Sequence, residues 1–166
     1  MQKLDLDTYI PSLLLWVSNK MSASATQLYS SKFGIGVTDW RVLAYFEAYP
    51  WTTASSAGGI TGIDKAAISR SVAFLVESGW LRSRPEGLRK IEYATSASGK
   101  RLYARVYVRA MERQEALLTG VSSEQRALLA ALLRTMLGNL DAVARVGQDR
   151  PSLPARRRNR QTTEPR

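Results

Sequence analysis

The stretch "TGIDKAAISRSVAFLVESGWL", residues 61–81, combines an apolar stripe with a small, polar and basic surface. Ile68, Val72, Leu75 and Val76 recur at helical spacing, which predicts a helix of about four turns with one buried face. The remaining positions offer hydrogen-bond donors, acceptors and positive charge with little bulk. They are Lys65, Ala66, Ala67, Ser69, Arg70 and Ala73. Such a face suits close approach to a polar surface.

The residues before this helix predict a short turn into it. Residues 52–63, "TTASSAGGITGI", are expected to form a short helix of low propensity, because each glycine costs roughly 1 kcal/mol relative to alanine in a helix interior. Gly62 is expected to end that helix, and Asp64 is well placed to cap the next one. Two helices joined by so short a turn are typical of a helix-turn-helix.

The residues after the helix predict a β-hairpin. Beyond Gly79, the segments "WLRSR" (80–84) and "IEYAT" (91–95) alternate like two short strands around the basic turn "PEGLRK" (85–90). A hairpin placed directly after a helix-turn-helix is a wing. The sequence therefore predicts a winged helix-turn-helix over this part of the chain.

Apolar periodicity and capping signals predict four further helices around this unit. They are residues 9–33; residues 39–49, capped by Thr38; a helix from Ser96 or Ser98 to Leu118; and a last helix through Val143, which opens with the capping box Ser122 and Gln125. The expected fold is mostly α with a small β-wing, a winged helix-turn-helix with long N- and C-terminal helices.

Composition narrows the classes of function. The 166 residues carry 24 Lys and Arg against 14 Asp and Glu, a net charge of +10 that favours a polyanionic partner. The sequence has no Cys, which excludes thiolate metal sites, and no His, which is the commonest metal ligand and the commonest general base. We therefore expect neither an enzyme nor a metal or other cofactor. Neither an apolar run long enough to span a bilayer nor a signal peptide is evident, which favours a bacterial cytoplasm.

The order of these elements resembles the MarR family of winged-helix transcription regulators. "DKAAISRSVAFLVESGWLRSR" (64–84) is similar to the family's recognition helix and first wing strand, and "VTDWRVL" (37–43) to its entry into the second helix. The resemblance covers nearly all of the chain up to about residue 146. It implies a regulator that binds a pseudopalindromic DNA operator, most simply a repressor released by a ligand.

Two positions depart from the family pattern. The family wing often carries Asp-x-Arg, and here Gly87 stands where the Asp would be, while Arg89 matches the Arg. In the following Leu-Thr-x-x-Gly turn, Thr95 and Ser96 replace Leu-Thr before Gly99. The wing can still form, but Arg89 lacks the usual carboxylate brace.

The resemblance places the quoted helix in the major groove of DNA. Small side chains at Ala66 and Ala67 permit close approach of the helix, and Ser69 and Arg70 can hydrogen-bond base edges or phosphates. Lys65 is expected to contact a phosphate. The alternative for the cations is a solvated basic face, and for Ser69 a hydroxyl bonded back to its own helix.

On the wing, the expected DNA contacts come from basic residues near the hairpin tip. In this family that tip reaches the neighbouring minor groove or its phosphates. The residues are Arg84, Arg89 and Lys90.

Specific binding generally needs two winged helices about one helical turn (~34 Å) apart, so a homodimer is expected. The first and last helices carry apolar stripes that would form its interface. The expected organisation is an N-terminal dimerisation helix (1–36), the winged helix-turn-helix (37–96), C-terminal dimerisation helices (97–146) and a disordered basic tail (147–166). The tail either adds attraction to DNA through Arg156, Arg157 and Arg158 or only keeps the protein soluble.

The resemblance also implies a small-molecule crevice between the dimerisation helices and the winged helix. An aromatic carboxylic acid or its thioester is the expected effector, because aromatic side chains stack rings and Arg binds carboxylates. The candidate residues are Trp16, Trp40, Arg41, Tyr45 and Trp51, which are alternatively core or helix-joint residues.

Two other classes of function stay open. A winged-helix module for protein interaction would not need a basic wing and would show no salt-sensitive DNA binding. A nucleic-acid enzyme would need an acidic cluster, a phosphate-binding loop or a nucleophile with its base, and the sequence shows none of these patterns.

Overall fold

The computed structural model describes residues 2–147 of the chain, which divides into two compact units, Met1–Leu117 and Leu118–Arg166. The tail from residue 148 onward, with the tail arginines named above, lies outside the described residues.

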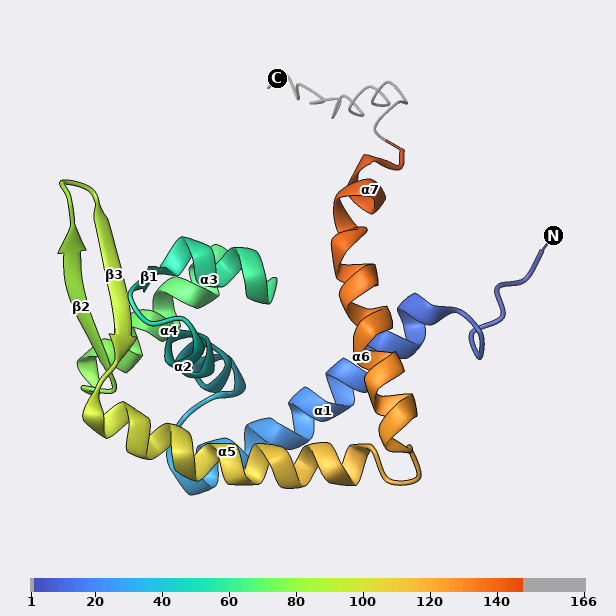
Figure 1. Cartoon of the computed structure of the whole chain (residues 1–166), viewed down its shortest axis with the longest axis horizontal. Coiled ribbons are helices and arrows are strands. Elements are labelled where there is room, and N and C mark those ends of the chain that lie inside the picture. The colour runs from blue at the N-terminus through green and yellow to red at the C-terminus, as the bar shows by residue number, and fades with distance from the viewer. Residues whose placement is uncertain (1, 148–166) are drawn as a thin grey trace, which may run out of the picture. The chain divides into compact units, whose positions relative to one another are not determined.

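The elements follow the expected order (Figure 1). The first unit contains α1 (Ile10–Phe33), α2 (Val37–Ala48), β1 (Thr52–Thr53), α3 (Ala54–Thr61), α4 (Lys65–Glu77), β2 (Leu81–Glu86), β3 (Lys90–Thr95) and α5 (Ala97–Leu117). The second unit contains α6 (Ser123–Gly138) and α7 (Leu140–Arg145).

The core of the first unit lies between α2, α4 and α5. Val42, Leu43 and Phe46 of α2 are fully buried, and they pack in one cluster with Leu75 of α4 and Val106 of α5. The predicted stripe of α4 is confirmed, since Ile68, Val72 and Leu75 are buried and Val76 is half-buried. Burial of this stripe fixes the opposite face of α4 toward solvent.

The turn between α3 and α4 has the predicted chemistry. Gly62 ends α3 in the left-handed region, at φ 67°, where glycine avoids the steric cost of a side chain. The carboxylate of Asp64 accepts a hydrogen bond from the Ala67 amide at 2.9 Å, which caps the first turn of α4. The helix-turn-helix prediction is thus confirmed in its local details.

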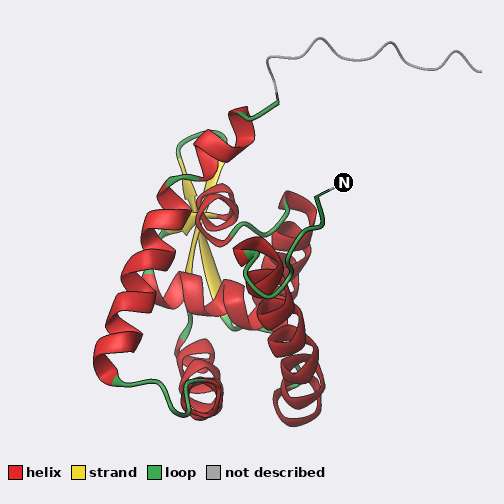
Figure 2. Ribbon diagram, turned by 90° about the vertical axis from the view of Figure 1, so that its right-hand side faces the viewer, coloured by secondary structure: helices red, strands yellow, loops and turns green. Residues whose placement is uncertain are grey.

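The wing is an antiparallel hairpin in a three-stranded sheet of order β1-β3-β2. Its register runs from Leu81 opposite Thr95 at the base to Glu86 opposite Lys90 at the tip. In Figures 1 and 2 the hairpin forms a narrow ribbon that extends beyond the helices of the first unit. The edge strand β1, which pairs Thr52 with Tyr93, was not predicted.

Two predicted helix boundaries were wrong. The second helix begins at Val37 with Gly36 as its N-cap, so Thr38 lies inside the first turn; the Asp39 carboxylate accepts a hydrogen bond from the Gly36 amide at 2.8 Å. The last helix opens with the predicted capping box but breaks at Asn139. Gly138, a poor helix former, immediately precedes that break.

The second unit also corrects the expectation about apolar runs. Within the described residues, Ser123–Arg145 is a helical stretch long and apolar enough to cross a membrane by length and composition, with a mean hydropathy of 1.4. No part of that window is buried in the chain taken alone.

Gly99 fixes the junction between the wing and α5. The residue is buried, and a Cβ added there would collide with the Trp80 carbonyl and lie 2.8 Å from Cγ2 of Thr95. The hydroxyls of Ser96 and Ser98 hold the same junction by donating to the Gly79 carbonyl at 2.6 and 2.7 Å. Only glycine fits this approach of helix to hairpin.

A Gly99→Ala substitution is therefore expected to destabilise the fold by about 2–3 kcal/mol, because the added methyl group must displace backbone. Thermal unfolding followed by circular dichroism measures the effect. Gly59→Ala is the matched control, since a Cβ at Gly59 would meet no atom within 4 Å. Gly59→Ala should melt at or slightly above the wild type, because alanine is the better helix former. If Gly99→Ala melts with the wild type, the junction has room for the added methyl group.

Candidate nucleic-acid interface and ligand pocket

The exposed face of α4 displays the residues expected to contact DNA. Lys65, Ala66, Ser69 and Arg70 are exposed, and Ala67 is half-buried. The buried Ser71 on the opposite face donates to Oδ1 of Asp39 at 2.6 Å, which ties α4 to the first turn of α2. The small and basic face is thus held rigidly outward.

The wing tip presents cations beyond the body of the sheet. Arg89 and Lys90 are exposed at the hairpin turn, and Gly87 there adopts φ 64°. Gly87 stands at the position where the family pattern has a bracing Asp. Its left-handed backbone, which glycine adopts without steric cost, forms part of the hairpin turn. Leu88 is fully exposed between these residues.

Arg84 lies in a different environment from the tip residues. Its Nε and Nη2 atoms both donate to Oε2 of Glu92, at 2.8 and 2.7 Å, and its guanidinium lies 4.2 Å from the centroid of the Trp51 ring. The Arg82 guanidinium lies 5.1 Å from the same ring. The Trp51 ring therefore packs against two cations of β2.

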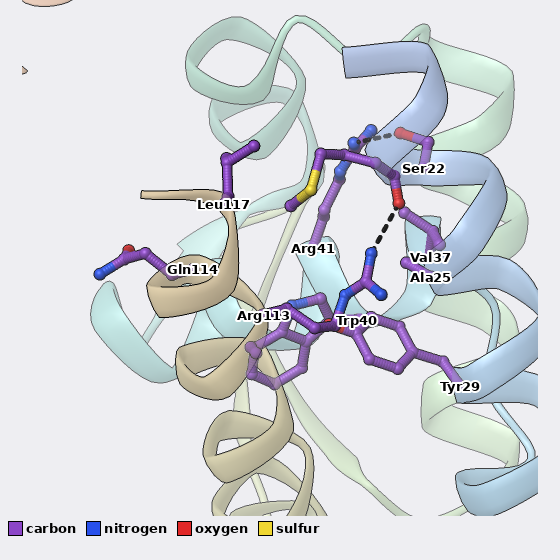
Figure 3. A pocket seen from close by; sticks show the side chains of 11 residues that line it. Ser22, Ala25, Tyr29, Val37, Trp40, Arg41, Arg113, Gln114 and Leu117 are labelled. Carbon is purple, nitrogen blue, oxygen red and sulfur yellow. Dashed lines mark hydrogen bonds between the residues drawn. The ribbon is translucent and has the colours of Figure 1, made fainter. Parts of the chain in front are cut away.

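A pocket of about 280 Å³ opens between α1, α2 and α5, all within the first unit. Figure 3 shows the side chains of Arg41 and Arg113 in this space. Nη2 of Arg41 donates to Oγ of Ser22 at 2.9 Å, and Nη2 of Arg113 donates to the Met21 carbonyl at 2.9 Å and to Oγ of Ser24 at 2.8 Å. No acidic residue is among the lining residues, so the pocket favours an anion.

Aromatic rings form one wall of this pocket. Trp40 stacks on Tyr103 with ring centroids 5.3 Å apart and meets the edge of Tyr29 at 6.2 Å. Burial raises the pKa of the Tyr103 hydroxyl above its usual value, with smaller contributions from Tyr107 and Glu47. Tyr103 therefore stays neutral at physiological pH, and the stack lends the pocket no negative charge.

Of the five residues suggested for an effector site, the structure brings two together in this pocket. Trp40 and Arg41 line it. Tyr45 is buried against Phe46, Trp51 lies beneath the wing, and Trp16 is exposed on the N-terminal half of α1. These three do not line the pocket.

Sequence reasoning missed the other polar residues of the pocket. Arg113, Gln114 and Ser22 line it, from α5 and α1. Arg113 is separated from its hydrogen-bond acceptor Met21 by 92 residues, so only the packing of the helices reveals the pair. A basic residue among the apolar positions of α5 was the one available signal.

Comparison with known proteins supports the same fold. No protein-family model matches the sequence, and a search of curated proteins finds no match. Among solved structures, a MarR/EmrR family transcriptional regulator from Acinetobacter sp. ADP1 is 26% identical, with a TM-score of 0.77 over 84% of this chain and 99% of that one.

Two other solved structures were determined as complexes. The PcaV transcriptional regulator from Streptomyces coelicolor, in complex with its natural ligand, is 20% identical, with a TM-score of 0.67 over 86% of this chain and 99% of that one. The MepR–DNA complex from S. aureus is 20% identical, with a TM-score of 0.68 over 80% of this chain and 96% of that one. The chain has the winged-helix fold of the MarR-family transcriptional regulators.

Proposed function

We propose that the protein is a homodimeric, sequence-specific DNA-binding repressor of transcription that acts in the bacterial cytoplasm, at the nucleoid. The observation that carries the proposal is the exposed α4 face, small and basic, held outward by a buried stripe beside a basic wing tip. On DNA, Ser69 and Arg70 read base edges, Lys65 binds a phosphate, and Ala66 and Ala67 allow the close approach. The MepR–DNA complex supports this use of the fold.

The wing supplies a second contact to the same duplex. Arg89 and Lys90 lie at the tip of the hairpin, which extends beyond the helices of the first unit (Figure 1). Contacts from these cations to minor-groove phosphates release counterions, so binding weakens steeply as salt rises. Arg84 belongs to the wing as well, but its guanidinium is held by Glu92 and the Trp51 ring.

Dimerisation follows from apolar surface that the isolated chain leaves exposed. Leu14, Leu15 and Val17 of α1 are exposed, as are Leu128 and Leu132 of α6. Exposed apolar stretches of this kind mark an interface, and a second copy provides a complementary one across a two-fold axis. The same axis presents two α4 helices to a pseudopalindromic operator.

The pocket between α1, α2 and α5 is the proposed effector site. Its volume of about 280 Å³ lies at the small end of the range for ligand pockets, so the pocket suits a single aromatic acid. If the effector is a thioester, its carrier group would remain outside the pocket. Trp40 would pack against the ring, while Arg41 and Arg113 would bind the carboxylate. The PcaV complex with its ligand supports a small-molecule effector in this fold.

A continuous set of contacts joins this pocket to α4. Trp40 and Arg41 line the pocket from the first turns of α2, and the neighbouring Asp39 accepts the hydrogen bond from Ser71 of α4. A ligand that shifts the start of α2 therefore shifts α4. The effector releases DNA only if it binds more tightly to the arrangement in which the two α4 helices are wrongly spaced.

DNase footprinting of the DNA upstream of the protein's own gene tests the proposed function. We expect protection of a pseudopalindrome whose half-sites are about one helical turn apart, in the presence of excess nonspecific DNA. Uniform protection, or none, would refute sequence-specific regulation at that site.

The double variant Arg41→Met/Arg113→Met is expected to lose the response to an aromatic acid. Benzoate is the probe and uncharged benzamide its matched control; benzoate should weaken DNA binding by the wild type, and benzamide should not. Charge-assisted hydrogen bonds contribute about 1.5–3 kcal/mol, so the variant should need at least about tenfold more benzoate. Isothermal titration calorimetry measures the binding directly.

Arg101→Met is the matched protein control, because Arg101 is an exposed arginine of α5 that does not line the pocket. Equal responses to benzoate and benzamide, or an unchanged response in the double variant, would remove the two arginines from the effector site.

A further inference from the structure

Trp51 has an unusual backbone conformation. Among the described residues it is the one non-glycine residue with positive φ, at 60°. For a bulky side chain that conformation costs of the order of 1–3 kcal/mol, and it persists only where surrounding contacts impose it. At Trp51 the identifiable contacts include a backbone hydrogen bond and two cation–π contacts to the strands of the wing.

The backbone of Trp51 is fastened to the central strand of the sheet. Its amide donates to the Tyr93 carbonyl at 2.8 Å, and the next residue, Thr52, pairs with Tyr93 in β1. The left-handed residue thus turns the chain from the end of α2 onto the edge of β3. This turn directs the indole ring toward β2.

The ring and Glu92 together hold Arg84 in place. The guanidinium lies 4.2 Å from the ring centroid, within the range of a cation–π interaction, and two of its nitrogens donate to one carboxylate oxygen of Glu92. The Glu92 side chain is 13% exposed and the Arg84 side chain 52%, so the carboxylate is sheltered while solvent still partly screens the pair. Arg84 and Glu92 are also directly opposed across β2 and β3.

We infer that Trp51 is a positioning residue for the wing, and that Arg84 acts as its brace and does not itself contact DNA. The inference rests on the proposed function. Trp51, Arg84 and Glu92 fix the middle of the hairpin to the chain that follows α2, and they thereby set where Arg89 and Lys90 at the tip meet the duplex. This mid-hairpin contact replaces a brace at the tip, where Gly87 offers no carboxylate.

The first test is a double-mutant cycle between Trp51, which contacts the middle of the hairpin, and Arg89 at its tip. The probe is a fluorescently labelled duplex recovered by selection from a random-sequence library with the wild-type protein. Arg89→Ala should weaken binding about tenfold, since each subunit loses one contact. Trp51→Leu should weaken DNA binding to a similar extent. The double variant should bind DNA no more weakly than the single variant with the lower affinity, because a displaced wing has no tip contact to lose.

The conservative variant Trp51→Phe is the matched control. It keeps an aromatic face beneath Arg84, so it should restore binding to within a few-fold of the wild type. Circular dichroism and melting temperatures check that each variant is folded. If Trp51 contributes only to stability, Trp51→Leu should lower the melting temperature. Arg89→Ala should then weaken DNA binding by the same factor in the Trp51→Leu protein as in the wild type.

Glu92→Gln gives a second and independent test. If Arg84 is a brace, loss of the carboxylate frees the wing, and DNA binding weakens. If Arg84 contacts a phosphate directly, loss of the neighbouring negative charge strengthens binding instead. The two interpretations therefore predict opposite signs for the same substitution.

The inference is overturned by unchanged affinity of Trp51→Leu, by additive effects in the cycle, or by tighter binding of Glu92→Gln. In each case an intact Arg89→Ala effect would leave the proposed function standing. Failure of the library to yield any preferred duplex for the wild type would overturn the proposed function and this inference with it.

Discussion

A Leu132→Glu variant is expected to be a folded monomer that binds the operator at least about a thousandfold more weakly than the wild type. Leu132 is 52% exposed on α6, amid other exposed leucines of the same helix. In a two-fold interface the substitution places two unpaired carboxylates in an apolar contact, which costs several kcal/mol. A monomer then presents one α4 helix to a site that requires two.

Analytical ultracentrifugation measures the oligomeric state of the variant, and fluorescence anisotropy measures its binding to DNA. Glu is a good helix former, so α6 itself should persist. Leu132→Met preserves apolar volume and is the matched control, expected to remain dimeric. A Leu132→Glu protein that remains a dimer with full affinity would exclude α6 from the interface.

An Arg70→Ala variant is expected to bind the operator about a hundredfold more weakly, with a smaller loss on nonspecific DNA. Arg70 is exposed on α4 beside Ser69, and a bidentate contact from Arg to guanine discriminates by about 1–3 kcal/mol in each subunit. Its removal should therefore relax specificity at one position of each half-site. Fluorescence anisotropy with single-base variants of the operator at fixed salt measures this effect.

Lys32→Ala is the control for loss of charge, since it removes one exposed cation from the last turn of α1. If Arg70→Ala weakens operator and nonspecific duplexes equally, Arg70 binds a phosphate. If it changes neither, Arg70 lies outside the interface.

The helix-turn-helix could be predicted from the sequence because its signals are local. The spacing of Ile68, Val72 and Leu75 defines the buried face of α4, and Gly62 and Asp64 mark the turn before it by their backbone and capping chemistry. Each of these signals acts within a few residues, so no knowledge of tertiary packing was needed.

The features that escaped prediction depend on distant contacts or on competing local ones. The strand β1 has two residues and exists because β3 pairs with it, and the position of Trp51 follows from that pairing. The pocket joins α1 to Arg113 of α5 by hydrogen bonds across 92 residues. At the start of α2, Thr38 was a plausible cap, but the Asp39 carboxylate instead reaches back to the Gly36 amide.

The central claim is that α4 and the wing read a particular DNA sequence, and a competition measurement tests it most directly. Anisotropy titrations at about 150 mM salt compare the selected pseudopalindromic duplex with a scrambled duplex of the same composition. The account predicts at least about a thousandfold preference for the selected duplex, and a loss of most of that preference in Arg70→Ala. Equal affinity of the wild type for both duplexes would contradict it.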